Sequence, residues 1–169
     1  INRLMEMPRG SGLLVGVGGS GKQSLTRLSS YISRASCKQI VITKQYNKNS
    51  FLEDIKTMYL SAGPQQKPTT FLFTESEIKD EVFLENLNSV LLTGEIPGLF
   101  AKDEIMAITA DMRNAFIKER EGMEESLDNL KQYFTDKVRD NLHIMICMSP
   151  MNPKFPIRAR KFPGLVSCP

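Results

Sequence analysis

A glycine-rich segment that ends in a lysine constrains this chain more than any other feature. Residues 16–24 read GVGGSGKQS and match the phosphate-loop pattern G-x-x-x-x-G-K-[ST] at Gly16, Gly21 and Lys22. The match fails at the last position, where Gln23 stands in place of serine or threonine. A short apolar run precedes the segment, and apolar residues at helical spacing follow it. This order predicts a buried strand, a glycine turn and a helix.

Apolar runs alternate with helical patterns along the rest of the chain. Such alternation is typical of a parallel sheet joined by right-handed helical crossovers. We therefore predict an α/β fold, a three-layer sandwich in which helices flank a central parallel sheet. Strands are expected at residues 12–17, 39–43, 69–74 and 143–148; helices are expected after Lys22, from a Ser50/Glu53 capping box, across residues 83–91, within residues 104–114 and over residues 123–138.

The composition excludes several classes of protein. The formal net charge is only +3 over 169 residues, which argues against a nucleic-acid surface built on charge. No apolar run reaches the length of a membrane span, and His143 is the single histidine, so little material exists for a zinc site or a Ser/His/Asp triad. Cys37, Cys147 and Cys168 are widely spaced, and we interpret them as reduced, mostly buried thiols of an intracellular protein.

Anion binding at the glycine-rich loop has a definite physical cause. Backbone N–H groups of the turn point inward, and the helix that follows presents the positive end of its dipole. Lys22 supplies charge for the β- and γ-phosphates, which predicts a nucleotide triphosphate as the ligand. The alternative is a strand–helix turn that carries a lysine by chance. The candidate phosphate-binding residues are Gly16, Val17, Gly18, Gly19, Ser20, Gly21, Lys22, Gln23 and Ser24.

The positions that normally hold Mg²⁺ are altered. Gln23 replaces the hydroxyl that coordinates the metal in P-loop NTPases. The partner strand ends in FLFTESE, with Thr74 at the position of the metal-binding aspartate and Glu75 at that of the catalytic glutamate. Glu75 and Glu77 are both available if the segment is extended, since residues two apart then share one side. Otherwise they form a charge pattern ahead of the next helix. Loss of both usual metal ligands favours slow or absent hydrolysis.

The order of these motifs resembles the dynein heavy chain, specifically the fourth AAA+ module of the motor ring in axonemal dyneins. The resemblance covers essentially the whole chain. The strings that carry it are LLVGVGGSGKQSLTRL, FLFTESEIKDEVFLENLNSVLLTGEIPGLFAKDE, VRDNLHIMICMSP and RKFPGLVSC. It implies that residues 1–169 are the large α/β subdomain of one AAA+ module, cut from a much longer chain and lacking the helical lid.

The resemblance also implies roles for particular residues. Gly16, Gly19, Gly21 and Lys22 match the phosphate loop, and Glu75 matches the catalytic glutamate. Ser149 falls where a polar sensor residue faces the γ-phosphate, although it also suits a turn before Pro150. The basic cluster Arg158, Arg160 and Lys161 lies where an arginine finger for the neighbouring site is expected; a solvated basic face is the alternative.

Several functions fit these observations. The resemblance favours a regulatory module that binds ATP or ADP within a ring of unlike modules, in a motor that moves toward microtubule minus ends. An active ATPase site, a nucleotide-free structural module and a small kinase are the alternatives. The implied partners are the neighbouring AAA+ modules, the dynein intermediate and light chains, and microtubules through the stalk of the parent protein. The implied location is the cytoplasm and cytoskeleton, in the axoneme of cilia or flagella.

Overall fold

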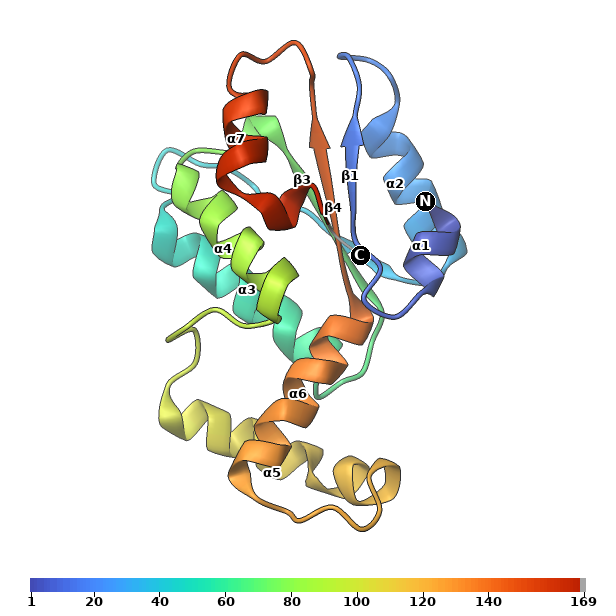
Figure 1. Ribbon diagram of the computed structural model, residues 1–169, viewed down its shortest axis with the longest axis vertical. Coiled ribbons are helices and arrows are strands. Elements are labelled where there is room, and N and C mark those ends of the chain that lie inside the picture. The colour runs from blue at the N-terminus through green and yellow to red at the C-terminus, as the bar shows by residue number, and fades with distance from the viewer. Residues whose placement is uncertain (168–169) are drawn as a thin grey trace.

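A sheet of four parallel strands forms the centre of the molecule. The computed structural model describes residues 1–167. The strand order is β1-β4-β3-β2, with bounds Gly12–Val15 for β1, Ser36–Lys38 for β2, Thr69–Thr74 for β3 and Leu142–Met148 for β4 (Figure 1). The predicted α/β fold with a central parallel sheet is confirmed.

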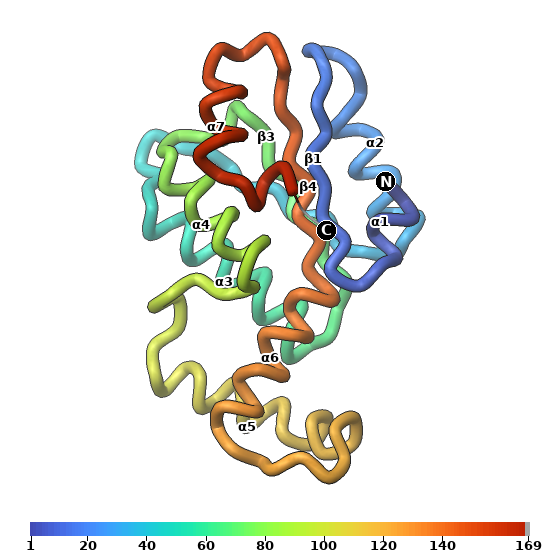
Figure 2. The backbone as a smooth tube through the Cα atoms, viewed as in Figure 1, coloured from blue at the N-terminus to red at the C-terminus, as the bar shows by residue number. Residues whose placement is uncertain are grey.

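Helices cover both faces of the sheet and one end of it (Figures 1 and 2). On one face lie α1 (Asn2–Glu6) and α2 (Lys22–Ile32), and on the other lie α3 (Lys48–Ala62), α4 (Glu81–Thr93) and α7 (Phe155–Lys161). α5 (Lys102–Glu119) and α6 (Leu127–Asn141) extend beyond the end at which the strands begin. Two short 3₁₀ turns, η1 (Glu75–Glu77) and η2 (Pro163–Leu165), complete the described elements. The three-layer arrangement is the predicted one.

The core is centred on β3, β4 and the helices that cover them on the α3 side. Every residue of β3 and β4 is buried, as expected for central strands of a parallel sheet. Phe51 of α3 stacks on Phe83 of α4 with ring centroids 4.5 Å apart and nearly parallel planes. The Phe51 ring also meets Phe71 and Phe73 of β3. These aromatic contacts fix two helices against one face of the sheet.

The helices begin and end at residues that differ from those predicted. The expected Ser50/Glu53 capping box is wrong: Asn47 caps α3, and its side chain accepts hydrogen bonds from the backbone of Asn49 and Ser50. Asparagine is as good an N-cap as serine, so the earlier start is chemically reasonable. The helices expected at residues 104–114 and 123–138 are found with the bounds given above for α5 and α6.

The strand expected at residues 39–43 is also wrong. β2 ends at Lys38, and the β-branched run that follows has no regular secondary structure. The side chains of this run differ in burial: Ile40 lies in the core, whereas Val41 is exposed. β2 pairs with β3 alone, so it forms one edge of the sheet and the chain leaves it after a short pairing.

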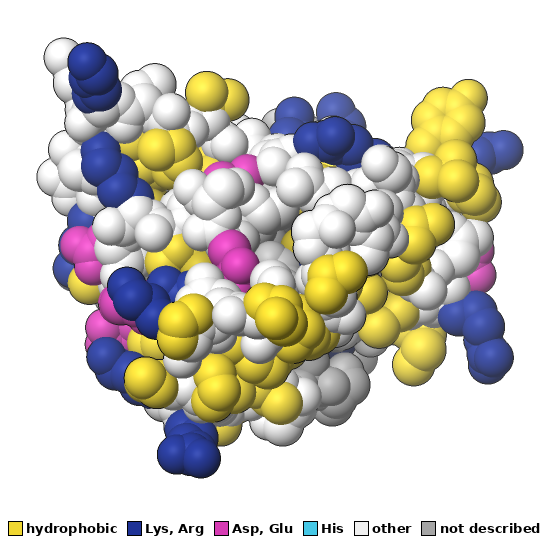
Figure 3. Space-filling model, turned by 90° about the horizontal axis from the view of Figure 1, so that it is seen from above, with side chains coloured by type: hydrophobic (Ala, Val, Ile, Leu, Met, Phe, Trp, Pro, Cys, Tyr) yellow, Lys and Arg dark blue, Asp and Glu magenta, His cyan; other side chains and the backbone are white. Residues whose placement is uncertain are grey.

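The face of α2 that carries its apolar residues lies at the surface. Leu25, Leu28, Tyr31 and Ile32 are each more than half exposed. The neighbouring strand β1 forms the second edge of the sheet and is half-buried, not fully buried as predicted. Figure 3 looks down on the end at which the strands finish and shows hydrophobic side chains exposed there. An apolar helical stripe ordinarily faces a core, and this one does not.

We expect Leu28→Gln to change the free energy of unfolding by less than about 0.5 kcal/mol, because Leu28 is 55% exposed and glutamine is a good helix former. Urea unfolding followed by circular dichroism measures this change. The matched control is Leu84→Gln in α4, where the side chain is fully buried and a buried amide is costly. Equal destabilisation by the two substitutions would show that the α2 stripe is packed.

Candidate phosphate-binding site

Residues 16–21 connect β1 to α2 in a turn that only glycine accommodates easily. Gly19 and Gly21 have φ values of 77° and 76°, in the left-handed region that other residues rarely adopt. Gly21 is the N-cap of α2, and no side chain caps the first turn of this helix. A Cβ atom at Gly16 would lie 2.8 Å from Ser20 Oγ. The loop therefore has the open backbone and the free helix N-terminus that a bound anion requires.

The lysine of the loop is folded back over it. The Lys22 ammonium donates hydrogen bonds to the carbonyl oxygens of Gly16 (2.6 Å) and Val17 (2.9 Å) and to Ser20 Oγ (3.0 Å). The positive charge is thus held directly against the turn, within reach of any anion that the turn binds. These partners are neutral, so a phosphate can compete for the same donors.

A cavity of about 410 Å³ opens over the loop. Two of its lining side chains carry a positive charge, Lys22 and Arg27, and Gln23 is exposed at its wall. The lining residues include no carboxylate. They are Gly18, Gly19, Ser20, Gly21, Lys22, Gln23, Ser24 and Arg27.

The acidic segment after β3 turns instead of continuing as a strand. Glu77 is buried, and its carboxylate accepts hydrogen bonds from the backbone N–H of Thr74 (2.9 Å) and from the side-chain amide of Gln39. The prediction that Glu75 and Glu77 share one side of an extended segment is wrong, because η1 rotates them apart. Burial raises the pKa of Glu77, and the hydrogen bonds from Thr74 and Gln39 oppose this rise.

The two residues at the positions expected for metal and catalysis have different environments. Thr74 is buried, and its hydroxyl pairs with Ser76 Oγ at 2.8 Å. Oε1 of Glu75 is buried and has no hydrogen-bond partner. Thr74 lies opposite Cys147 of β4. Burial raises the pKa of the Cys147 thiol, and the nearby Thr26 hydroxyl and Lys22 charge oppose this rise. The ends of β3 and β4 therefore meet the start of α2 at one place.

These residues do not fit the usual Mg²⁺ site of a P-loop NTPase. Gln23 offers an amide in place of a hydroxyl, and the Thr74 hydroxyl is already paired with Ser76. Within residues 1–167 no group of three or more His, Cys, Asp or Glu side chains is placed to hold a metal ion. The glycine-rich loop therefore keeps the candidate phosphate-binding groups, whereas the usual Mg²⁺ ligands are replaced.

Ser149 and the basic cluster lie beyond β4. The Ser149 hydroxyl accepts a hydrogen bond from the backbone of Met151 at 3.3 Å, as in a serine turn. Arg158 is buried, and it donates to Glu81 Oε1 from Nε (3.1 Å) and from a terminal nitrogen (2.7 Å). A solvated basic face therefore describes Arg160 and Lys161, which are exposed, but not Arg158.

One set of hydrogen bonds at the site was not predicted from the sequence. The Arg27 guanidinium of α2 donates to Gln39 Oε1, and the amide nitrogen of Gln39 donates to Glu77. Three segments far apart in the sequence are joined in this way. Since Gln39 was expected inside a strand, no local pattern marked it.

The histidine and the described cysteines have the following environments. His143 is buried, with Nδ1 2.6 Å from the Gly10 carbonyl oxygen, and burial lowers its pKa. Cys37 is half-buried and Cys147 is buried, and both are free thiols; Cys168 lies outside the described residues. No helix within residues 1–167 is long and apolar enough to cross a bilayer.

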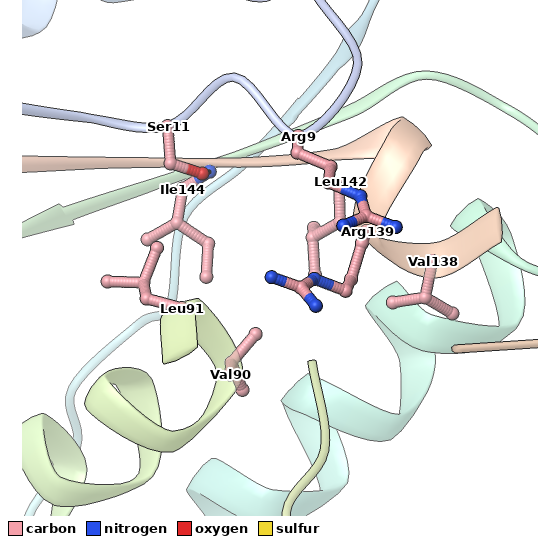
Figure 4. A pocket seen from close by; sticks show the side chains of 8 residues that line it. All are labelled: Arg9, Ser11, Val90, Leu91, Val138, Arg139, Leu142 and Ile144. Carbon is pink, nitrogen blue, oxygen red and sulfur yellow. Dashed lines mark hydrogen bonds between the residues drawn. The ribbon is translucent and has the colours of Figure 1, made fainter. Parts of the chain in front are cut away.

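A separate cavity lies at the other end of the sheet, where β4 begins. Its lining includes Arg9, Arg139, Leu142 and Ile144 (Figure 4). Arg9 pairs with carboxylates of α6, and Figure 4 shows the Arg139 guanidinium directed into the cavity. The phosphate loop lies at the opposite end of β4, because its Gly16 N–H bonds to Met148. This cavity is therefore no part of the loop site.

Comparison with known proteins places the whole chain in one family. A family model described as "P-loop containing dynein motor region D4" matches residues 1–169. The chain is 51% identical over 99% of its length to dynein axonemal heavy chain 5 of Rattus norvegicus. It is 45% identical to the dynein-1-beta heavy chain of the flagellar inner arm I1 complex and 47% identical to the dynein gamma chain of the flagellar outer arm, both of Chlamydomonas reinhardtii and both over 99% of the chain.

The chain spans only 4–5% of the length of these relatives. The similarity extends over the loop, the acidic turn and the described elements alike, since it covers nearly every residue. The chain therefore belongs to the P-loop-containing dynein motor region D4 family, within the AAA region of axonemal-type dynein heavy chains.

Proposed function

We propose that this chain is a regulatory nucleotide-binding module, the fourth AAA+ module of a dynein motor ring, which binds ATP or ADP and hydrolyses ATP slowly or not at all. The observation that carries this proposal is the loop geometry. Gly19 and Gly21 hold the turn open in left-handed conformations, and the Lys22 ammonium lies against it. Nucleotide occupancy would then bias the conformation of the ring, and turnover at other modules would drive movement.

The weakness of the metal position supports binding without catalysis. A P-loop NTPase relies on Mg²⁺ to bridge the β- and γ-phosphates and neutralise developing charge. Gln23 and the paired hydroxyl of Thr74 are poor ligands for this ion. The nine loop residues from Gly16 to Ser24 are proposed to hold the phosphates, and the backbone and Lys22 supply most of the binding.

An active ATPase site is the second candidate, and one observation favours it. Glu75 Oε1 is buried without a partner, as expected of a carboxylate kept free to orient water. In that case Ser149, at the end of β4, would act as the sensor residue. A nucleotide-free structural module is the third candidate, and measurement of binding separates it from the first two.

We expect Glu75→Gln to leave ATP turnover within about twofold of the unsubstituted protein, because a site without a metal gains little from a base. The measurement is steady-state phosphate release by the full heavy chain with its other nucleotide sites disabled. The matched control is Glu85→Gln on α4, an exposed carboxylate. A fall of about 100-fold specific to Glu75→Gln would establish the active ATPase instead.

The proposed partners follow from the relatives. The relatives are named as axonemal or flagellar dynein chains, so we propose an axonemal location, with adjacent AAA+ modules as direct neighbours. Intermediate chains, light chains and microtubules would be contacted through other parts of the heavy chain. We expect weak nucleotide affinity for this chain alone, because a lid and a neighbouring module would ordinarily complete the site.

A further inference from the structure

Arg27 connects the cavity over the loop to the acidic turn after β3. It lies one helical turn after Gln23, and both line the cavity. Long side chains on a helix lean toward its N-terminus, so the Arg27 guanidinium extends toward the turn that carries Gln23. It donates a hydrogen bond to the neutral amide of Gln39, its charge opposes the rise in the pKa of the nearby Glu77 carboxyl, and the side chain is exposed.

The charges around the cavity favour a free polyphosphate over its magnesium complex. Lys22 and Arg27 are the cations of the lining, and the lining includes no carboxylate. Free ATP carries more negative charge than its magnesium complex, so a cationic cradle gains more from the free anion. A magnesium ion in this cavity would face two cationic side chains and no carboxylate of the lining.

We propose that Arg27 is a phosphate-binding residue, and that its guanidinium neutralises phosphate charge at the position where P-loop NTPases hold Mg²⁺. This inference rests on the proposed nucleotide binding and specifies how the altered site achieves it. A hydrogen bond between guanidinium and phosphate is charge-assisted, whereas Arg27 now bonds to the neutral amide of Gln39. A bound phosphate therefore replaces Gln39 as the partner of Arg27. Binding at this site is then independent of magnesium.

The exchange has a structural consequence at the acidic turn. When Arg27 moves to the phosphate, Gln39 loses its donor and keeps only its bond to Glu77. Glu77 in turn holds the backbone of Thr74, at the end of the central strand β3. Nucleotide binding at the loop thus changes the hydrogen bonding of Gln39 and of the acidic turn, although the nucleotide contacts neither.

The test is a titration of the ¹⁵N-labelled chain with ATP, once with EDTA and once with excess MgCl₂, followed by NMR. Shifts of the loop amides and of the Gln39 side-chain amide give the dissociation constant. We expect binding in EDTA at least as tight as with magnesium. Arg27→Gln is expected to weaken binding in EDTA by about tenfold, the loss typical of a charge-assisted hydrogen bond, and Arg27→Lys by less.

Arg34→Gln is the matched control, since it removes the same charge from an exposed arginine just beyond the far end of α2 and is expected to leave the dissociation constant within twofold. If Arg27→Gln binds as tightly as the unsubstituted chain while Lys22→Met does not, the role of Arg27 is overturned and the proposed function stands. Because the affinity of the chain alone is expected to be weak, the titration extends to millimolar ATP; if no loop amide of the unsubstituted chain shifts even there, both are overturned. Tighter binding with magnesium would also overturn the role of Arg27.

Discussion

Lys22→Met is expected to weaken ATP binding by about 100-fold, or about 2.7 kcal/mol. The ammonium now makes three hydrogen bonds to the loop, at 2.6, 2.9 and 3.0 Å, all to neutral oxygens. Phosphate oxygens would replace these partners with charge-assisted bonds, and methionine can form none of them. The NMR titration of loop amides with ATP measures the change.

The variant must be distinguished from one that merely loses the shape of the loop. Lys38→Met is the matched control, because it removes the same charge from an exposed lysine at the end of β2 that lies outside the cavity lining. The free Lys22→Met chain should keep the amide resonances of β3 and β4. An unchanged dissociation constant would refute phosphate binding by Lys22.

Phe51→Ala is expected to cost about 3–5 kcal/mol of the free energy of unfolding. The ring is fully buried, stacks on Phe83 at a centroid distance of 4.5 Å, and meets Phe73 at 6.1 Å. Its removal leaves a cavity between α3, α4 and β3 that rigid elements cannot close. Urea unfolding followed by circular dichroism provides the measurement.

Two further variants keep this prediction testable if Phe51→Ala fails to fold. Phe51→Leu removes only part of the ring and should cost about 1–2 kcal/mol. Tyr31→Ala removes an aromatic ring that is 81% exposed and should cost less than about 0.5 kcal/mol. A Phe51→Ala chain as stable as the Tyr31→Ala chain would show that the aromatic cluster is not the core.

The predictable parts of the molecule are those whose signal is local. A continuous apolar run marked β3, and it is buried at all six positions because its neighbours cover both faces. α4 ends at Gly94, its C-cap, which adopts φ 79°, a conformation that other residues avoid, so this end has a local cause. The glycine-rich loop was recognisable because Gly19 and Gly21 adopt left-handed conformations that other residues rarely take.

The wrong predictions arose where the outcome depends on distant contacts. The β-branched run at residues 39–43 has strand propensity, but pairing ends at Lys38 and Gln39 instead bonds to Arg27 and Glu77. Strand propensity is weak compared with such tertiary contacts. Glu75 and Glu77 likewise diverge because Glu77 turns back to bond the Thr74 backbone.

The sequence by itself determined the order of elements and the phosphate loop, because apolar periodicity and glycine conformation act over neighbouring residues. Only the tertiary structure decided that Arg158 is buried against Glu81, that the apolar stripe of α2 is exposed, and that Arg27 lies at the loop cavity. These facts depend on which helix lies beside which strand. That arrangement is set by contacts between residues far apart in the sequence, and no short segment records it.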